Sequence, residues 1–548
     1  MTQSPGESGA VRVDIVDDTL ATQAATIVDQ LVIESFAGKL AAQDPTLWGS
    51  DAEPEAAVRL SWTTLHESSR PLLAEIESLR ADLAEEGVAR VVLAGMGGSS
   101  LAPEVISRTA GVELTVLDTT DPAQVADALA GEPARTVLVV SSKSGSTVET
   151  DSHRRIFTKA FTEAGIDPAA RTVVVTDPGS PLQTLAEEAG YRKVFLADPN
   201  VGGRYSALTA FGLVPAGLAG ADIAALLDEA AAAAAVLARD EQDNPALRLG
   251  AALGAAHAAG AEKVVLADTG SPVKGFADWA EQLIAESTGK NGTGLLPVAI
   301  DESAGITEAG FADAGSDATP VAIGPPAGAA KIATAGPLGG LILLWECATA
   351  VAGKLLGINP FDQPDVEAAK KAARALLDEP SGSAQEARPA FTVDEVSVYA
   401  PAELLGSARS LTAAVRALLA AAPEHGYLAV QAYLDRIDDA SAAVLRGELA
   451  RRSGLQTTFG WGPRFLHSTG QYHKGGHQNG VFLQITGVVE SDIEVPEQPF
   501  TLGVLQQAQA LGDAAVLRDH GRPVLRLHLL DRLAGLSALV KAVEEISK

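Results

Sequence analysis

The sequence predicts an α/β protein with doubly wound parallel sheets. Short apolar runs rich in β-branched residues alternate with stretches of helical length. These runs are hydrophobic throughout instead of alternating with polar residues, as expected for strands that helices cover on both faces. Loops rich in glycine or serine follow two of the runs directly, at the edge where open α/β sheets collect their ligands.

Composition favours a soluble chain without disulfides. The 548 residues include 70 acidic and 41 basic side chains, and the net charge of −29 repels nucleic acid and anionic lipid at long range. Cys347 is the only cysteine, and the amino terminus lacks a basic stretch followed by an apolar one, so we expect a cytoplasmic protein. Any bound phosphate must therefore be held by local donors.

Residues 1–87 are expected to form an N-terminal helical segment, in which Trp48 and Trp62 pack one helix on another. Residues 88–215 form the first predicted sheet domain. Its expected strands are 88–94, 112–118, 136–142, 172–176 and 193–197.

A second sheet domain is expected over residues 216–380, after an alanine-rich helix at 222–238. Its predicted strands are 263–268, 295–300 and 320–323, covered by helices at 338–356 and 365–377. A linker at 378–389 precedes a C-terminal α/β unit over 390–548. Strands of this unit are expected at 427–433, 481–486 and 524–529.

Residues 332–353 are almost free of charge and about as long as a membrane span. The segment nevertheless contains Glu346, Pro337 and a pair of glycines, and it lies between motifs typical of soluble proteins. We therefore predict a buried core helix and no membrane association.

The first candidate ligand loop is GMGGSS, residues 95–100, which follows an expected strand and precedes an expected helix. Its glycines allow backbone amides to converge on a ligand oxygen. A dinucleotide site is an alternative, supported by Asp118 at the end of the next strand, although the full G-x-G-x-x-G spacing is absent.

The second loop, SSKSGSTVET, indicates a phosphate monoester instead. It presents several hydroxyl groups and the hinge Gly145 at the start of a helix, and such a density of donors suits a dianion. A polar turn that caps a helix is the alternative, which would need one hydroxyl. Glu149 is interpreted as a first-turn carboxylate of the helix and not as a catalytic base.

Glu286 is the candidate base, in the segment AESTGK at the end of a predicted helix. The helix dipole disfavours an anion there, so the position predicts a raised glutamate pKa unless a cation compensates. An exposed glutamate at a frayed helix end is the alternative explanation.

These two loops resemble the sugar isomerase (SIS) domain, and further segments resemble the glucose-6-phosphate isomerase family. The segments are VGGRYSALTAFGL, AESTGKNGTGLLP, NPFDQPDVEAAKK and FLHSTGQYHKGG, which begin at residues 201, 285, 359 and 465. The resemblance implies two doubly wound SIS domains with an additional C-terminal α/β unit. It also implies glycolytic and gluconeogenic interconversion of glucose 6-phosphate and fructose 6-phosphate, with no cofactor and no metal.

The resemblance also implies roles for particular residues. Glu286 would move a proton between C1 and C2 through a cis-enediol, Arg204 would steady the enediolate, and Lys370 and His467 would open and close the sugar ring. The implied substrate-binding residues are Gly98, Ser99, Ser142, Lys143 through its backbone, Ser144, Thr147, Gln282 and Gln363. Such chemistry needs a carboxylate, an electrophile and an acid/base pair, while the phosphate aligns the substrate.

Several alternatives remain open at this stage. Lys370 and Lys371 together fit a solvated helix face, and His467, His473 and His477 could suggest a metal site. An isomerase that also accepts mannose 6-phosphate would need only a small change near Gln282 or Gln363. A non-catalytic phosphosugar-binding regulator is the alternative from another class.

The order Glu286, Lys370, His467 departs from the family, in which the histidine follows the glutamate closely and the lysine comes last. The C-terminal sequence is similar to the isomerase half of transaldolase and phosphoglucose isomerase fusions. Family resemblance implies a homodimer whose partner chain supplies the histidine. The attached C-terminal unit instead suggests that His467 completes the site within its own chain.

Overall fold

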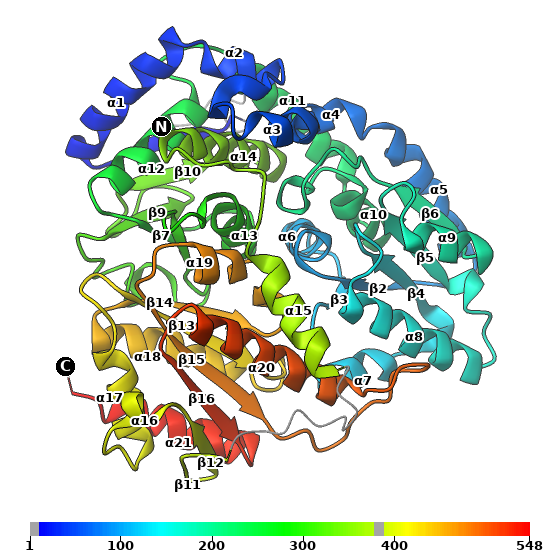
Figure 1. The fold of residues 1–548 in the computed structure, drawn as a ribbon. Helices are drawn as coiled ribbons and strands as arrows, with labels where there is room; N and C mark the ends of the chain where they lie inside the picture. The colour runs from blue at the N-terminus through cyan, green and yellow to red at the C-terminus, as the bar shows by residue number, and fades with distance from the viewer. Residues whose placement is uncertain (1–9, 378–387, 548) are drawn as a thin grey trace.

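Three sheets surrounded by helices make up the protein, which is α/β as predicted (Figure 1). The computed structural model describes residues 10–377 and 388–547, without the side chains of 366–370. The predicted linker at 378–389 therefore falls almost entirely outside the described residues. Each sheet lies within one of the three predicted α/β units, apart from one N-terminal strand, and the exact division of the chain into domains stays a prediction.

The first sheet has five parallel strands in the order β3-β2-β4-β5-β6. They are β2 (Arg90–Gly95), β3 (Thr115–Leu117), β4 (Thr136–Ser141), β5 (Thr172–Thr176) and β6 (Lys193–Leu196). Val91 and Leu93 face one side of the sheet, whereas Val92 and Ala94 face the other. The first side is covered by α5 (Pro71–Glu85), α6 (Leu101–Ala110) and α10 (Ala210–Ala219), and the second by α7 (Pro122–Ala130), α8 (Val148–Glu163) and α9 (Pro181–Glu188).

The second sheet has the order β1-β10-β9-β7-β8, and only β1 runs antiparallel to its neighbour. Its strands are β1 (Arg12–Ile15), β7 (Lys263–Asp268), β8 (Leu296–Ala299), β9 (Ala318–Ile323) and β10 (Ile332–Ala335). One face packs against α1 (Asp18–Ile33), α11 (Ile223–Leu237), α12 (Pro245–Ala258), α13 (Phe276–Thr288) and α14 (Leu338–Leu355). The sequence did not predict the edge strand β1 or its neighbour β10, because both are short segments next to long helical patterns. The buried helix predicted over 332–353 was therefore wrong at its start, where residues 332–335 form β10.

The N-terminal helices pack on one another and also against the first two units. After α1 the chain forms α2 (Phe36–Ala41), α3 (Glu53–Arg59) and α4 (Leu65–Ser68), with 3₁₀ turns at Pro45–Trp48 and Leu60–Thr64. Trp48 packs edge-on against Phe36 and Phe361, and Trp62 stacks on Tyr205. The two tryptophans were expected to pack N-terminal helices on each other. Each of them also contacts an aromatic ring far along the chain, in Phe361 and Tyr205.

The third sheet is mixed, in the order β11-β12-β16-β15-β13-β14. Its strands are β11 (Phe391–Val393), β12 (Val396–Tyr399), β13 (Tyr427–Tyr433), β14 (Gln456–Trp461), β15 (Gly480–Gly487) and β16 (Val524–Leu529). Its helices are α16 (Ala402–Leu405), α17 (Leu411–Ala420), α18 (Val444–Ser453), α19 (Gly470–Gly475), α20 (Leu502–Asp519) and α21 (Arg532–Glu544). Strands β16, β15, β13 and β14 are parallel, whereas β12 and β11 at the other edge each run antiparallel to the strand before them.

The C-terminal unit covers the second face of the second sheet. Val265 and Val298 of that sheet share one apolar core with Tyr427, Phe482 and Leu517 of the C-terminal unit. The same unit reaches the first sheet through Leu502 and Leu505 at the start of α20. Helix α15 (Val366–Leu377) packs along α20 and lies between the units (Figure 1). The C-terminal unit is therefore part of a common core.

Helix α14 is long and apolar enough to cross a membrane, but 89% of its apolar window is buried inside the protein. It packs against α11, α12 and α13, as predicted for a core helix. Glu346 on this helix is 1% exposed, and neither of its carboxyl oxygens has a hydrogen-bond partner. Burial raises the pKa of Glu346 well above its ordinary value.

We expect Glu346→Gln to stabilise the protein increasingly as the pH rises. The folded chain keeps this carboxyl protonated at pH values where the unfolded chain loses the proton, so wild-type stability falls as the pH rises above the ordinary value of 4.5 towards the folded-state pKa. The free energy of unfolding of the wild type falls by at most about 1.4 kcal/mol for each pH unit because of this group. The glutamine amide does not titrate, so the variant lacks this contribution. Thermal unfolding across this pH range measures the effect.

The exposed Glu77 of α5 provides the matched control, since Glu77→Gln should follow the wild type at every pH. Equal pH slopes for the wild type and Glu346→Gln would contradict a neutral buried carboxyl at this position.

Candidate active site

The first predicted ligand loop follows β2 and includes the 3₁₀ turn η3 (Gly97–Ser99). A Cβ atom on Gly98 would lie 2.0 Å from the carbonyl oxygen of Gly203, so only glycine fits there. Gly97 has a φ of 55°, and a Cβ atom there would lie 2.7 Å from the His467 carbonyl oxygen. The loop is therefore pressed between the segments that carry Arg204 and His467.

The second loop joins β4 to α8 and presents its hydroxyl groups together. The Ser142 and Thr147 hydroxyls lie 2.9 Å apart, and those of Ser144 and Ser146 lie 3.0 Å apart. Gly145 has a φ of 69° and donates its N–H to the Ser142 hydroxyl oxygen. Together with the amino terminus of the 16-residue helix α8, these groups suit an anion.

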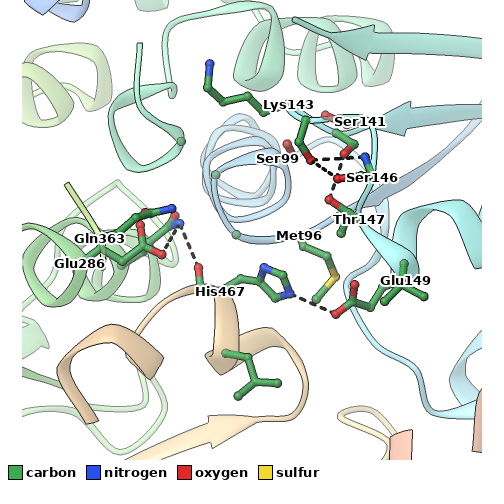
Figure 2. Close-up of a pocket in the computed structure, with 18 of the residues that line it drawn as sticks. Met96, Ser99, Ser141, Lys143, Ser146, Thr147, Glu149, Glu286, Gln363 and His467 are labelled. Atoms are coloured by element: carbon green, nitrogen blue, oxygen red, sulfur yellow. Dashed lines mark hydrogen bonds and ion pairs between the residues drawn. The ribbon is translucent and has the colours of Figure 1, made fainter. Parts of the chain in front are cut away.

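Lys143 points away from the hydroxyl groups of its own loop (Figure 2). Its Nζ atom pairs with Asp177 at 2.5 Å and also donates to the Pro199 carbonyl oxygen. Burial raises the pKa of Asp177 even though Lys143 opposes the shift. The prediction that Lys143 serves a ligand through its backbone is consistent with this geometry.

Glu286 lies in the last turn of α13 and is 5% exposed, so it is not an exposed residue at a frayed helix end. Its Oε2 atom is 3.6 Å from Nη1 of Arg204, and its Oε1 atom is 3.4 Å from Nε2 of Gln282. Arg204 thereby supplies the compensating cation that the helix end requires. A buried carboxylate and a buried guanidinium thus face each other.

Arg204 is fixed from several directions in the 3₁₀ turn η6 (Gly203–Tyr205). Its guanidinium donates to the Ser287 hydroxyl at 2.9 Å, to Gln363 Oε1 at 3.1 Å and to the carbonyl oxygens of Pro360 and Asp362. These bonds use the planar fork of arginine, which lysine lacks. Arg204 is thus buried and is not a surface arginine.

Lys290 secures the turn that carries Gln363. Its side chain is 1% exposed and donates to the Asn359 carbonyl oxygen and to both the carbonyl and the carboxylate of Asp362. Burial, aided by the nearby Arg204 charge, lowers the pKa of Lys290 to about 8. The sequence analysis did not single out this lysine, although it belongs to the quoted ESTGK segment.

His467 ends the 3₁₀ turn η9 (Arg464–His467), and its Nε2 atom lies 3.1 Å from Glu149 Oε1 of the same chain (Figure 2). Gln509 of α20 also donates to Glu149, at 2.6 Å. Glu149 is in the first turn of α8 as predicted, but it is 4% exposed and has this second role as the partner of His467. Local sequence gives no signal for that contact, since 318 positions separate the two residues.

The other two histidines of this region have different partners. His473 is 2% exposed, stacks on Tyr427 and has its pKa lowered well below the ordinary value by burial. His477 instead pairs with Glu262 at 2.9 Å. Among the described residues, no cluster of metal-ligating side chains contains His467, His473 or His477.

These elements enclose one cavity of about 560 Å³, shown in Figure 2. Glu286 and His467 line it, as do all the predicted substrate-binding residues: Gly98, Ser99, Ser142, Lys143, Ser144, Thr147, Gln282 and Gln363. Arg204 is not among the lining residues, and its Nη1 atom lies 3.6 Å from Glu286 Oε2. Lys370 belongs to α15, which contributes to the cavity wall, but its side chain is outside the described part of the structure.

The wall also contains polar residues that were not predicted to bind or act on a ligand, among them Glu149, Asp177, Ser206, Arg374, Lys474 and Gln509. Lys474 lies in the quoted histidine segment and is paired with the fully buried Asp513 at 2.6 Å. Arg374 lies one helical turn after Lys370 on α15, and its Nη2 atom is 3.4 Å from the Ser146 carbonyl oxygen. In the sequence Arg374 and Gln509 look like ordinary helix positions. Only the packing of α15 against α20 brings them to the cavity.

The fold and the cavity together define an α/β protein with a hydroxyl-rich loop opposite a buried carboxylate. A family model described as phosphoglucose isomerase matches residues 64–319. A Natronomonas pharaonis protein named "Probable glucose-6-phosphate isomerase" is 34% identical over 337 residues, which cover 52% of this chain and 78% of that protein. The glucose-6-phosphate isomerase of Rubrobacter xylanophilus is 30% identical over 401 residues, which cover 60% of this chain and 90% of that protein.

Two solved structures are also similar. A hypothetical protein from Thermus thermophilus has a TM-score of 0.57 and 27% identity, covering 67% of this chain and all of that one. A glucose-6-phosphate isomerase from Chlamydia trachomatis has a TM-score of 0.54 and 18% identity, covering 69% of this chain and 91% of that one. At this identity the similarity supports the fold alone. The chain belongs to the phosphoglucose isomerase family. The match to the family model ends before Lys370 and His467.

We expect Arg374→Gln to weaken the binding of inorganic phosphate to this cavity by about tenfold. A dianion at the loop requires positive charge, and the ammonium of Lys143 is engaged by Asp177. Arg374 lies beside the loop and can turn its guanidinium to the anion. Calorimetric titration with phosphate gives the dissociation constant.

Lys371→Gln is the matched control, because this exposed lysine of the same helix does not line the cavity. An equal loss of phosphate affinity in both variants would point to general electrostatics instead of a contact by Arg374.

Proposed function

We propose that this protein is a glucose-6-phosphate isomerase that interconverts glucose 6-phosphate and fructose 6-phosphate. The observation that carries the proposal is the single cavity in which the buried Glu286 faces the hydroxyl-rich loop around Ser142 and Thr147. The membership of the chain in the phosphoglucose isomerase family supports the same activity. A glycolytic and gluconeogenic role in the cytoplasm belongs to this proposal.

The substrate phosphate is held by the loop before α8. Ser142, Ser144 and Thr147 donate hydroxyl hydrogen bonds, and backbone amides at the start of the helix add to them. The phosphate does not react, so its binding energy fixes the position of the sugar carbons over Glu286.

Proton transfer between C1 and C2 is the task of Glu286. The carboxylate removes a proton from one carbon and returns it to the other, which passes the sugar through a cis-enediol. Arg204 lies 3.6 Å from the carboxylate and has a fixed positive charge, so it can stabilise the oxyanion that develops beside the base. Gln282 and Gln363 border the same space and orient the hydroxyl groups of the sugar.

Ring opening is assigned to His467 and Lys370, as the family resemblance implies. His467 lines the cavity, and its contact with Glu149 orients the imidazole for proton transfer at the ring oxygen. The helix that carries Lys370 also forms part of the cavity wall through Ala373 and Arg374. Gly98 and Ser99 complete the sugar side of the cavity.

Two alternative functions are separated by one assay. An isomerase that also uses mannose 6-phosphate would form fructose 6-phosphate from that sugar as well, and a phosphosugar-binding regulator would form it from neither. The paired Arg204 and Glu286 favour an enzyme, because a binding protein gains nothing from a buried base beside a buried cation.

The wild type should form fructose 6-phosphate from glucose 6-phosphate with chelator present, and Glu286→Gln should lower kcat by about 10²- to 10⁴-fold. The amide keeps the shape of the side chain but cannot accept the proton. A coupled assay of fructose 6-phosphate measures both rates. Glu281→Gln, on the same helix but outside this cavity, is the matched control. Near wild-type turnover by Glu286→Gln would remove this carboxylate from the mechanism.

We also infer that the active site is complete within one chain, whether or not the protein forms a homodimer. His467 contacts Glu149 of its own chain, so the histidine does not need to come from a partner. A mixture of Glu286→Gln chains with His467→Ala chains should therefore stay as inactive as its components after joint unfolding and refolding. Activity of the mixture is followed with the same coupled assay.

Wild-type chains mixed with the double variant in the same way provide the control for losses during refolding. Recovery of about a quarter or more of the control activity in the mixture of single variants would show that His467 crosses between chains.

A further inference from the structure

Three aspartates from two units of the protein meet outside the active-site cavity. Asp127 lies on α7 of the first unit, and Asp435 and Asp438 follow β13 of the C-terminal unit. Each offers a carboxylate oxygen, and these oxygens lie within 4.8 Å of one another. None of the three lines the active-site cavity. Like charges held this close repel each other, so the arrangement calls for a compensating group.

Asp435 is the buried member of the cluster, with 1% of its surface exposed. Its Oδ1 atom accepts hydrogen bonds from the backbone N–H groups of Ile437 and Asp438, at 2.8 and 3.1 Å. Its Oδ2 atom is buried and has no hydrogen-bond partner. A buried carboxylate oxygen without a partner is costly, and a bound cation would satisfy it.

The cationic side chain next to the cluster, Arg532, already forms ion pairs with two other carboxylates. Arg532 pairs with Asp121 at 2.8 Å and with Asp439 at 3.0 Å. Asp439 in turn accepts the backbone N–H of Asp435. Arg532 carries one positive charge against these two carboxylates, so it leaves none for the three clustered aspartates. In a chain with a net charge of −29, long-range attraction adds to the local demand for a cation.

We propose that Asp127, Asp435 and Asp438 bind a divalent hard cation of the size of Ca²⁺. Oxygen ligands lie about 2.3–2.6 Å from Ca²⁺, so two ligands on opposite sides are separated by about 4.6–5.2 Å. The three oxygens lie within 4.8 Å of one another, so one ion can reach all of them. Ca²⁺ tolerates irregular ligand geometry from two units better than Mg²⁺, which demands a near-ideal octahedron. Asp127 and Asp438 are exposed, which leaves room for water as further ligands.

Such an ion would fasten the C-terminal unit to the first unit. Its ligands come from α7 and from the segment after β13, which are more than 300 positions apart in the chain. The site differs in residues and in chemistry from the proposed isomerase cavity, so the two proposals stand or fall separately.

Calorimetric titration of the full-length, chelator-treated protein with CaCl₂ and with MgCl₂ tests the proposal. We expect one Ca²⁺ site for each chain, weaker binding of Mg²⁺, and a rise in melting temperature with Ca²⁺. Asp438→Asn and Asp127→Asn should each weaken Ca²⁺ binding at least about tenfold, because each removes a ligand charge from a different unit. Asp82→Asn, an exposed position on α5, should bind Ca²⁺ like the wild type.

Both variants change exposed side chains, so folding is checked by their melting temperatures in chelator, which should not fall below that of the wild type. The absence of saturable Ca²⁺ binding by the wild type would overturn the proposal. Unchanged affinity in Asp438→Asn or in Asp127→Asn would overturn it as well, since the ion would then lie elsewhere on the acidic surface.

Discussion

The second sheet must be covered on both faces, and this requirement organises the protein. Helices α11 to α14 cover one face, while Tyr427, Phe482 and Leu517 of the C-terminal unit close the other within a shared apolar core. A parallel sheet with one bare face would expose a large apolar surface to water. The position of the C-terminal unit is therefore a consequence of core packing.

The active-site cavity follows from that placement. Helix α20 extends from the first sheet to the second, and its Gln509 therefore reaches Glu149. The turn before α19 places His467 beside the same carboxylate. Three buried charge pairs result: Arg204 with Glu286, His467 with Glu149 when the imidazole is protonated, and Lys474 with Asp513. The first two join different units, and breaking such a pair leaves an uncompensated buried charge. The cavity and the docking of the units thus depend on each other.

The order of the functional residues has the same explanation. In this chain the histidine follows the lysine, and it belongs to a unit beyond the residues that match the family model. A group that acts at the ring oxygen needs a position and an orientation, whatever its place in the chain. The C-terminal unit provides that position through its contact with Glu149, which supports the proposal of a site formed by one chain.

The sequence by itself determined the local chemistry. Glycine and serine loops at strand ends, the apolar strands of the first sheet and the segment around Glu286 each depend on near neighbours. The predicted substrate-binding residues, Glu286 and His467 line one cavity, and Arg204 lies 3.6 Å from Glu286. The short strands β1 and β10 were missed, because their apolar runs acquire partners only in the folded sheet. The approach of Glu149 to His467, of Arg374 to the phosphate loop and of Asp127 to Asp435 was decided by tertiary structure alone, since each depends on how apolar faces of distant elements pack together.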